Sequence, residues 1–367
     1  MLIREYIYER SYIPFWKKEN TMKIAVLANL KKDVPLIKEH PPDDEFWDDL
    51  DDVATLKAIR SALRDGGHRA KYIVPNVNLI RHLLNFKPDL CFNLCEGHFG
   101  ASREAQVPAI LDMLRLPYTG SGVLGMSLSH NKFIAKKVFR REGVPTAPFF
   151  LVEDPRQLPE FNIPFPLFVK PAHEGTSIGI NENSIVHDRE ALLRQVEYVW
   201  GKVHAPVLVE QYIAGREFTA SILGDEVLPL IEIKTPTGFY SNRLKEIDPT
   251  GVVRVCPADV PRRKLEQIRR IARAAMKHLE LVDIARVDMR MDAEGNVFVL
   301  EVNPLPLLLP NPQEASFVAS SLAAGYSYTE MVNRIVAISA ERLGIPVETQ
   351  PQTRPLQPKL ARKQAGG

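Results

Sequence analysis

The chain has 367 residues, 45% of them hydrophobic, and its 47 Lys and Arg nearly balance its 45 Asp and Glu. This length favours two or three lobes over one small domain. The net charge of +2 argues against a nucleic-acid partner, which needs a clustered positive surface. No apolar run reaches the roughly 20 residues of a membrane span. Of three cysteines, Cys91 and Cys95 lie close together without a second pair and Cys256 is alone, which indicates reduced thiols, and with an N-terminus that has no apolar signal core we expect the cytoplasm.

The N-terminal part of the chain alternates predicted strands and helices. We expect residues 1–22 to be an extension and residues 23–128 to form an α/β lobe. The predicted strands are 23–30, 69–75 and 88–94, and the predicted helices are 49–64 and 103–115. Such alternation is typical of an open parallel sheet, whose functional loops lie beyond the carboxyl ends of the strands.

Two further lobes are expected, at residues 129–205 and 206–345. In the second lobe the predicted elements are a basic helix at 131–142, strands at 147–152 and 166–171, and a helix at 188–200. In the third they are strands at 207–211, 217–223, 227–234, 285–291 and 297–302, and helices at 262–280 and 328–342. A turn at 292–296 makes a hairpin of the last two strands. The tail at 346–367, rich in Gln, Pro, Lys and Arg, is expected to be disordered.

The last two predicted strands carry the strongest candidate site. Strand alternation places Arg286 and Asp288 on one face, and likewise Glu301 and Asn303. The residues between them, Leu300 included, are apolar and are expected to back this face with a core. Carboxylate and amide oxygens suit Mg²⁺, which takes its other ligands from phosphate and water. Arg286 could neutralise a transferring phosphate. The alternative is a solvated face with a surface salt bridge.

Two separated lysines form a second candidate group. Lys170 ends a predicted strand before a polar loop with two glycines, and Lys132 lies in the helix after a Gly-rich turn. Lysines beside glycine loops suit nucleotide phosphates, because glycine lets backbone N–H groups approach. The loop at 174–177 is not a Walker A sequence, so the chain is not a P-loop protein. Taken alone, each lysine would be an ordinary surface residue.

A third group follows the predicted strand at 207–211. The polar backbone at the end of this strand could bond a purine. Glu210 could reach the adenine amino group, and Glu217 the ribose hydroxyls. The alternative for Glu217 is an ordinary strand carboxylate.

In order and spacing, these motifs resemble the D-alanine–D-alanine ligase family of the ATP-grasp superfamily over about residues 23–345. The matching elements are His98, the turn at 116–122, Lys132, Val169-Lys170-Pro171, the loop at 174–179, Glu210, residues 215–219, Cys256-Pro257-Ala258, Arg286-Val287-Asp288 and Glu301-Val302-Asn303. The resemblance implies an α/β, three-lobed ATP-grasp fold with an N-terminal open parallel-sheet lobe and with ATP between two of the lobes.

The resemblance also implies ATP and Mg²⁺ (or Mn²⁺) as cofactors, and small amino acids as substrates. The implied ATP-binding residues are Lys132, Lys170, Glu174, Thr176, Glu210, Gln211, Tyr212, Ile213 and Glu217. The implied metal ligands are Asp288, Glu301 and Asn303, and the implied catalytic residues are Arg286, His98, Ser177 and Lys245. A carboxylate would attack the γ-phosphate to give an acyl-phosphate, which an amine converts to an amide. The family is commonly dimeric.

The substrate end departs from the family pattern. Where the family reads Asn-x-x-Pro-Gly-x-Thr, Leu307 stands in place of the glycine, and Glu246 replaces a mobile-loop tyrosine. Asp52 is a candidate for the first substrate's ammonium, and Ser316 for a carboxylate. We predict D-alanine–D-alanine ligation in peptidoglycan precursor synthesis, or the joining of other amino acids, a hydroxy acid or a peptide. A nucleotide-binding module without catalysis is a weaker alternative, because such a module need not keep the full charge set. Carboxylate phosphorylation without ligation is weaker still.

Overall fold

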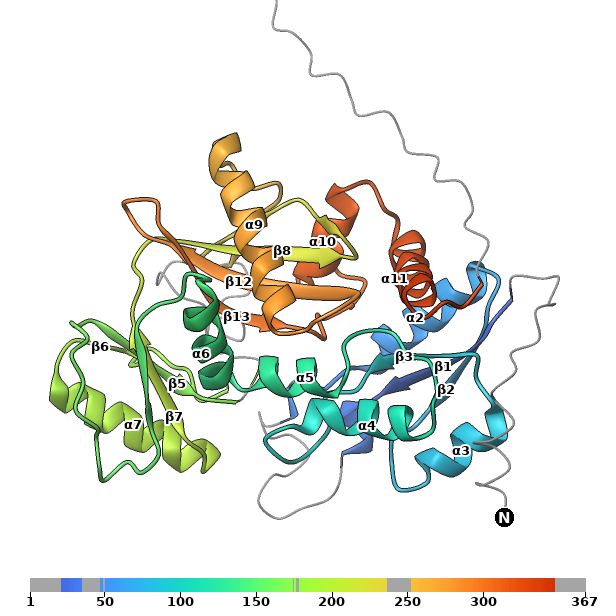
Figure 1. Ribbon diagram of the computed structural model, residues 1–367, viewed down its shortest axis with the longest axis horizontal. Helices are drawn as coiled ribbons and strands as arrows, with labels where there is room; N and C mark the ends of the chain where they lie inside the picture. Colours follow the sequence, from blue (N-terminus) through green and yellow to red (C-terminus); the bar gives the residue numbers. More distant parts are fainter. Residues whose placement is uncertain are drawn as a thin grey trace, which may run out of the picture.

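The computed structural model describes residues 21–34, 47–48, 50–173, 175, 178–235 and 252–346. Three β-sheets form the framework, and helices pack against them (Figure 1). Most of the predicted extension at 1–22 and of the predicted tail at 346–367 lies outside the described residues. Within the described ranges, no helix is both long enough and apolar enough to cross a membrane.

The first sheet is parallel, as the alternating pattern predicts. Strands β1 (Lys23–Ala28), β2 (Arg69–Ile73) and β3 (Leu90–Leu94) lie in the order β2-β1-β3. Its helical elements are η1 (Lys31–Asp33), α2 (Val53–Asp65), α3 (Leu79–Phe86), η3 (Arg103–Ala105) and α4 (Gln106–Met113). Helix α2 begins later than the predicted residue 49, because Asp52 caps it by accepting a hydrogen bond from the Thr55 N–H at 2.8 Å. Helix α3 was not predicted.

The second sheet contains a strand that the sequence assigns to the third lobe. Its strands are β4 (Phe149–Val152), β5 (Leu167–Pro171), β6 (Ile185–Val186) and β7 (Val207–Gln211), with helix α7 (Arg189–Val203) packed on them. The order is β4-β7-β5-β6, and β7 pairs antiparallel with β4 and β5. The predicted boundary at 205/206 is therefore wrong for β7. Its first four residues are all buried, as suits a strand enclosed by two neighbours.

Helices α5 (Val123–His130) and α6 (Lys132–Glu142) connect the first sheet to the other two. The third sheet contains β8 (Arg216–Leu223), β9 (Glu226–Val227), β10 (Ile231–Lys234), β11 (Val253–Val255), β12 (Ile284–Met291) and β13 (Val297–Asn303). Its order is β11-β10-β8-β12-β13, with β9 beside β8. The predicted single strand at 227–234 is wrong: Pro229 separates β9 from β10, since proline has no N–H to donate to a ladder.

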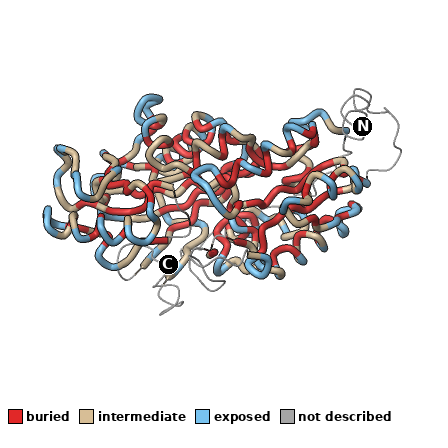
Figure 2. The backbone as a smooth tube through the Cα atoms, turned by 90° about the horizontal axis from the view of Figure 1, so that it is seen from below, coloured by how far each residue is buried: buried red, intermediate tan, exposed pale blue. Residues whose placement is uncertain are grey.

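The last helices join the third lobe to the first. Helices α9 (Arg262–His278), α10 (Ser316–Ala323) and α11 (Tyr328–Arg342) follow in the third lobe, and α11 packs on α2 (Figure 1). Buried side chains from both lobes form one core, among them Ile24, Val26, Ile59, Leu223, Ile284, Phe317, Val332 and Ile335. Figure 2 shows buried residues running through the interior and exposed segments at the periphery. This shared core fixes the position of the third sheet against the first.

Candidate functional site

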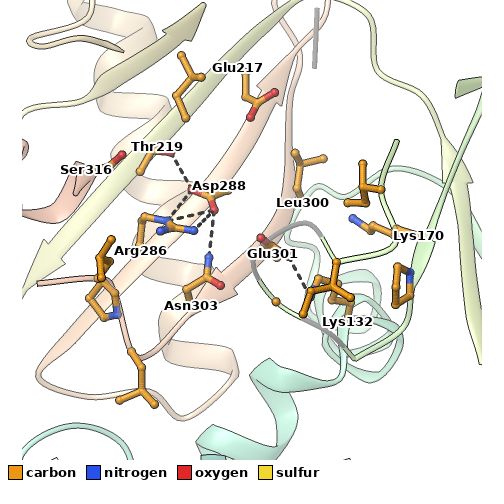
Figure 3. A pocket seen from close by; sticks show the side chains of 18 of the residues that line it. Lys132, Lys170, Glu217, Thr219, Arg286, Asp288, Leu300, Glu301, Asn303 and Ser316 are labelled. Atoms are coloured by element: carbon orange, nitrogen blue, oxygen red, sulfur yellow. Dashed lines mark hydrogen bonds and ion pairs between the residues drawn. The ribbon is translucent and has the colours of Figure 1, made fainter. Parts of the chain in front are cut away.

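A cavity of about 320 Å³ is lined by residues from all three lobes (Figure 3). Of the predicted site residues that the structure describes, all but His98 and Asp52 line this cavity. Positions as far apart in the sequence as Lys132 and Asn303 therefore converge. Glu174, Thr176, Ser177 and Lys245 lie outside the described residues, so their roles stay predictions.

Strands β12 and β13 carry the predicted acid–asparagine set on one wall of the cavity. Their register places Arg286 opposite Asn303, and Asp288 opposite Glu301. Asp288 accepts hydrogen bonds from Thr219 Oγ1 at 2.7 Å, from Asn303 Nδ2 at 3.0 Å and from Arg286 Nη2 at 2.9 Å (Figure 3). Among the described residues there is no group of three or more His, Cys, Asp or Glu that could hold a metal. The wall instead offers the few hard oxygen ligands that Mg²⁺ uses beside phosphate.

A β-bulge turns Leu300 into the cavity. The register moves from Asp288 opposite Glu301 to Met289 opposite Val299, so Leu300 is the extra residue. The prediction that Leu300 backs the site from the core is wrong, because a bulge lets two successive side chains lie on one face. Leu300 and Glu301 both line the cavity (Figure 3).

Lys132 and Lys170 lie across the cavity from Asp288 (Figure 3). Lys132 begins α6, and its backbone N–H donates to the Ala172 carbonyl at 2.8 Å, which ties α6 to the end of β5. Lys132 Nζ lies 3.2 Å from Glu301 Oε2. Burial acts to raise the pKa of Glu301, but Lys132 and Lys170 outweigh it and hold that pKa at about 2. Glu301 is therefore ionised at neutral pH.

A buried charge cluster supports Lys170 from behind. Lys170 Nζ and Lys136 Nζ each lie 2.6 Å from a carboxylate oxygen of Glu210. Lys136 is fully buried and donates to Thr146 Oγ1 at 2.6 Å. Burial acts to raise the pKa of Glu210, but the two ammonium groups hold it below its ordinary value. The sequence did not single out Lys136, because only the packing of α6 shows which of its lysines points inward.

The segment between β7 and β8 lies at the end of the cavity where the nucleotide base was predicted. Gln211, Tyr212 and Ile213 line the cavity there, with Glu217 beyond them on β8. Burial raises the pKa of Glu217 to about 7, and Arg290 opposes this shift from 2.8 Å away. Arg290 also lines the cavity and was missed. The alternation that identified Arg286 and Asp288 would have placed it on the same face.

Asp51, and not Asp52, lines the first-lobe end of the cavity. The Asp52 carboxylate is used as the cap of α2, so Asp51 replaces it as the candidate for a substrate ammonium. Burial, with a smaller contribution from the charge of Asp52, raises the pKa of Asp51 to about 7. A cationic substrate group beside Asp51 would favour the ionised form.

His98 lies in the first lobe outside the lining of the cavity. Its Nε2 lies 3.4 Å from Asn29 Nδ2, and its ring packs edge-on against Trp47. Burial, and next the charge of Arg103, lower the pKa of His98, so its ring is neutral at pH 7. Its predicted catalytic role stays a prediction.

Replacing Asp51 by Asn tests the pKa of this carboxyl. Between pH 4 and 7 the folded chain keeps a proton on Asp51 that the unfolded chain has lost, because the folded pKa is about 7 against the usual 3.8. Wild-type stability therefore falls as pH rises through this window. We expect Asp51→Asn to gain about 1–3 kcal/mol more in unfolding free energy at pH 8 than at pH 5, measured by urea titration. The exposed Asp65→Asn serves as control, and an equal gain at both pH values would contradict the raised pKa.

Residues 304–307 form an apolar wall directly after Asn303. Leu307, which stands where the family pattern has glycine, is 41% exposed and lines the cavity. Ser316, the first residue of α10, is buried and also lines it. The segment in which the sequence leaves the family pattern is thus part of the site itself.

The three sheets and the charged cavity between them agree with the known proteins to which the chain is similar, which are ligases of the ATP-grasp class. Residues 138–337 match the family described as "D-ala D-ala ligase C-terminus". This chain therefore belongs to the D-alanine–D-alanine ligase family, which confirms the resemblance and the fold class predicted from the sequence.

Individual relatives cover most of the chain. A D-alanine–D-alanine ligase of Pelotomaculum thermopropionicum is 33% identical over 80% of this chain and 93% of its own length. An uncharacterized protein of Sinorhizobium fredii is 32% identical over 78% of this chain and 87% of its own length. The crystal structure of the Bacillus anthracis D-alanine–D-alanine ligase complexed with ATP aligns with a TM-score of 0.67 at 24% identity, covering 88% of this chain and 98% of that one. The last comparison concerns the fold alone.

Proposed function

We propose that this protein couples ATP cleavage to the formation of an amide between two amino-acid substrates. One observation carries the proposal: two lysines of the second lobe face an arginine, two carboxylates and an amide of the third lobe across a single cavity. Cations on one side and hard oxygen ligands on the other suit a triphosphate and its metal ion.

In this proposal ATP lies between the second and third sheets. Glu210 and the backbone of residues 211–213 hold the adenine, and Glu217 holds the ribose. Lys132 and Lys170 neutralise the phosphates. Lys245, between β10 and β11 in the chain, adds a third basic contact to the phosphates. Glu174 and Thr176, which follow β5 in the chain, are the remaining predicted ATP-binding residues.

Asp288, Glu301 and Asn303 would hold the Mg²⁺ or Mn²⁺ that the family implies. Their oxygen atoms fit such an ion, because the three side chains lie on one cavity wall and the two carboxylates oppose each other in register. When bound, the metal neutralises charge on the phosphates. Lys132, whose Nζ lies 3.2 Å from Glu301 Oε2, adds positive charge from the facing side of the cavity.

The proposed chemistry has two steps. The first substrate's carboxylate attacks the γ-phosphorus, the bond to the β-phosphate oxygen breaks, and ADP and an acyl-phosphate result. The second substrate's amine then adds to the acyl carbon, and loss of phosphate and a proton leaves the amide. Arg286, which Asp288 holds at 2.9 Å, stabilises the oxyanion of the tetrahedral intermediate. His98 is predicted to lie near the first substrate, and Ser177 is the remaining predicted catalytic residue.

For the substrates we infer D-alanine in both places, joined in the cytoplasm as a peptidoglycan precursor. The D-alanine–D-alanine ligases among the relatives support this inference. The second candidate is a ligase of the same family that takes other amino acids, a hydroxy acid or a peptide. Leu307 and the apolar wall favour it, because a side chain lies where the family pattern brings bare backbone close to the substrate. A homodimer is a further prediction, which sedimentation would test.

Phosphate release tests the proposed function. ATP and Mg²⁺ are supplied with single and paired D-amino acids, L-amino acids and D-lactate, and products are identified by mass spectrometry. We expect D-alanine-dependent phosphate release with an equal yield of dipeptide. Dependence on another acid or amine would favour the second candidate. Release that no compound in the panel stimulates would contradict an amino-acid ligase.

A further inference from the structure

A buried guanidinium stands beside the proposed adenosine site. Arg290 lies on β12 and is only 4% exposed, yet it lines the cavity. Its strand register places it directly opposite Glu217 on β8, and its Nη1 lies 2.8 Å from Glu217 Oε2. A buried charge is stable only when it is paired and hydrogen-bonded, and Glu217 supplies the counter-charge for Arg290.

The other donors of Arg290 hold the segment between β7 and β8. Its Nε donates to the Ile213 carbonyl at 2.6 Å, and its Nη2 donates to the Gly215 carbonyl at 3.0 Å. The guanidinium also lies over the Tyr212 ring, 5.1 Å from the ring centroid. One side chain thereby fixes the 212–215 segment, proposed to bind the purine, relative to the Glu217 carboxylate, proposed to bind the ribose.

These contacts decide how Arg290 can act. Nε, Nη1 and Nη2 each already donate to a protein oxygen and the side chain is only 4% exposed, which leaves little of the guanidinium for a phosphate. It acts instead through the groups that it holds. Arg290 donates to Glu217 Oε2 and so orients the carboxylate, whose other oxygen is the acceptor for a ribose hydroxyl in the proposed site.

We propose that Arg290 is a positioning residue that sets recognition of the ribose and purine, and hence the preference for a ribonucleotide over its 2′-deoxy form. The proposal rests on the proposed nucleotide site. Without Arg290 the Glu217 carboxylate loses its fixed orientation, and the 212–215 segment loses three hydrogen bonds, to the Ile213 and Gly215 carbonyls and to the Tyr212 hydroxyl. Because a hydrogen bond to a charged group discriminates by about tenfold to a hundredfold, ATP should bind wild type that much more tightly than 2′-deoxyATP.

Calorimetric titration of the full chain with ATP and with 2′-deoxyATP, both with Mg²⁺, tests the proposal. We expect Arg290→Met to weaken ATP binding at least tenfold and to bring the two affinities within about threefold of each other. Arg290→Lys keeps the positive charge but lacks the planar set of guanidinium donors, so it should lose part of the preference for ATP over 2′-deoxyATP. This variant keeps the test decisive if Arg290→Met does not fold. In turnover assays KM for ATP should rise more than kcat falls.

Arg216→Met is the matched control. Arg216 also lies on the third sheet and forms a bidentate pair, with Glu232 at 2.7 and 2.8 Å, but it does not line the cavity. Its loss should leave the ATP to 2′-deoxyATP ratio unchanged. If wild type binds ATP and the Arg290 variants keep the wild-type ratio, the positioning role is wrong while the proposed function stands. If wild type binds neither nucleotide, both fail.

Discussion

Replacing Glu301 by Gln is expected to lower kcat by about two to three orders of magnitude while the protein stays folded. The change keeps the shape of the side chain and removes its charge. Glu301 is ionised at neutral pH, since its pKa is held at about 2. The substitution would remove the negative charge that lies 3.2 Å from Lys132 Nζ, and it would leave the proposed metal with one carboxylate ligand instead of two. Turnover is measured by ADP release at saturating ATP, Mg²⁺ and amino acid.

Glu294→Gln provides the control for this substitution. It makes the same chemical change in the turn that joins β12 and β13, where the side chain is exposed. Circular dichroism and thermal melting would establish that both variants are folded. A folded Glu301→Gln variant with near-normal turnover would remove Glu301 from the proposed metal site. A loss shared equally by Glu294→Gln would point to the hairpin and not to the carboxylate.

The acid–asparagine wall could be predicted because its information is local. Two short apolar strands joined by a five-residue turn fix the register, and alternation then puts Asp288 and Glu301 on one face. The confirmed first-lobe sheet is of the same kind, with strands and helices that alternate along the chain. Lys132 and Lys170 could be predicted from the order and spacing of the motifs, which carry the family resemblance, although neither lysine is distinctive alone.

Features that depend on packing were not predictable in the same way. An apolar strand such as β7 does not reveal which of two adjacent sheets will enclose it. The bulge that turns Leu300 into the cavity depends on a mismatch between two paired strands. Lys136 is buried against Glu210, a partner distant in sequence, so in the sequence it looks like an ordinary surface lysine. Alternation gives the face of Arg290, but its pairing with Glu217 appears only in the packed sheet.

A second large effect, on stability, is expected at Asp283. This residue joins elements of the first lobe to elements of the third. This buried carboxylate accepts from the Gly120 N–H at 2.8 Å, from Ser339 Oγ at 2.5 Å and from Arg342 Nε at 2.7 Å. Arg342 Nη2 also donates to the Tyr118 carbonyl at 3.1 Å. The turn after α4, the start of β12 and helix α11 therefore meet at one buried charge.

Arg342→Met should lower the free energy of unfolding by about 3 kcal/mol, because it leaves the Asp283 carboxylate buried without its counter-charge. Urea unfolding at pH 7 measures the loss. Arg334→Met on the same helix is the control, since within the described part of the chain Arg334 has no ion pair, and it should change stability by less than about 0.5 kcal/mol.

A double substitution separates the charge from the packing. Asn tolerates the left-handed backbone of Asp283, whose φ is 64°, and carries no charge to compensate. Asp283→Asn should therefore cost less in the Arg342→Met background than in wild type, and the difference gives the coupling free energy of the pair. Additive losses would mean that Arg342 stabilises the fold through its contacts with the 118–120 turn, and that the buried charge is held by Ser339 and the Gly120 N–H alone.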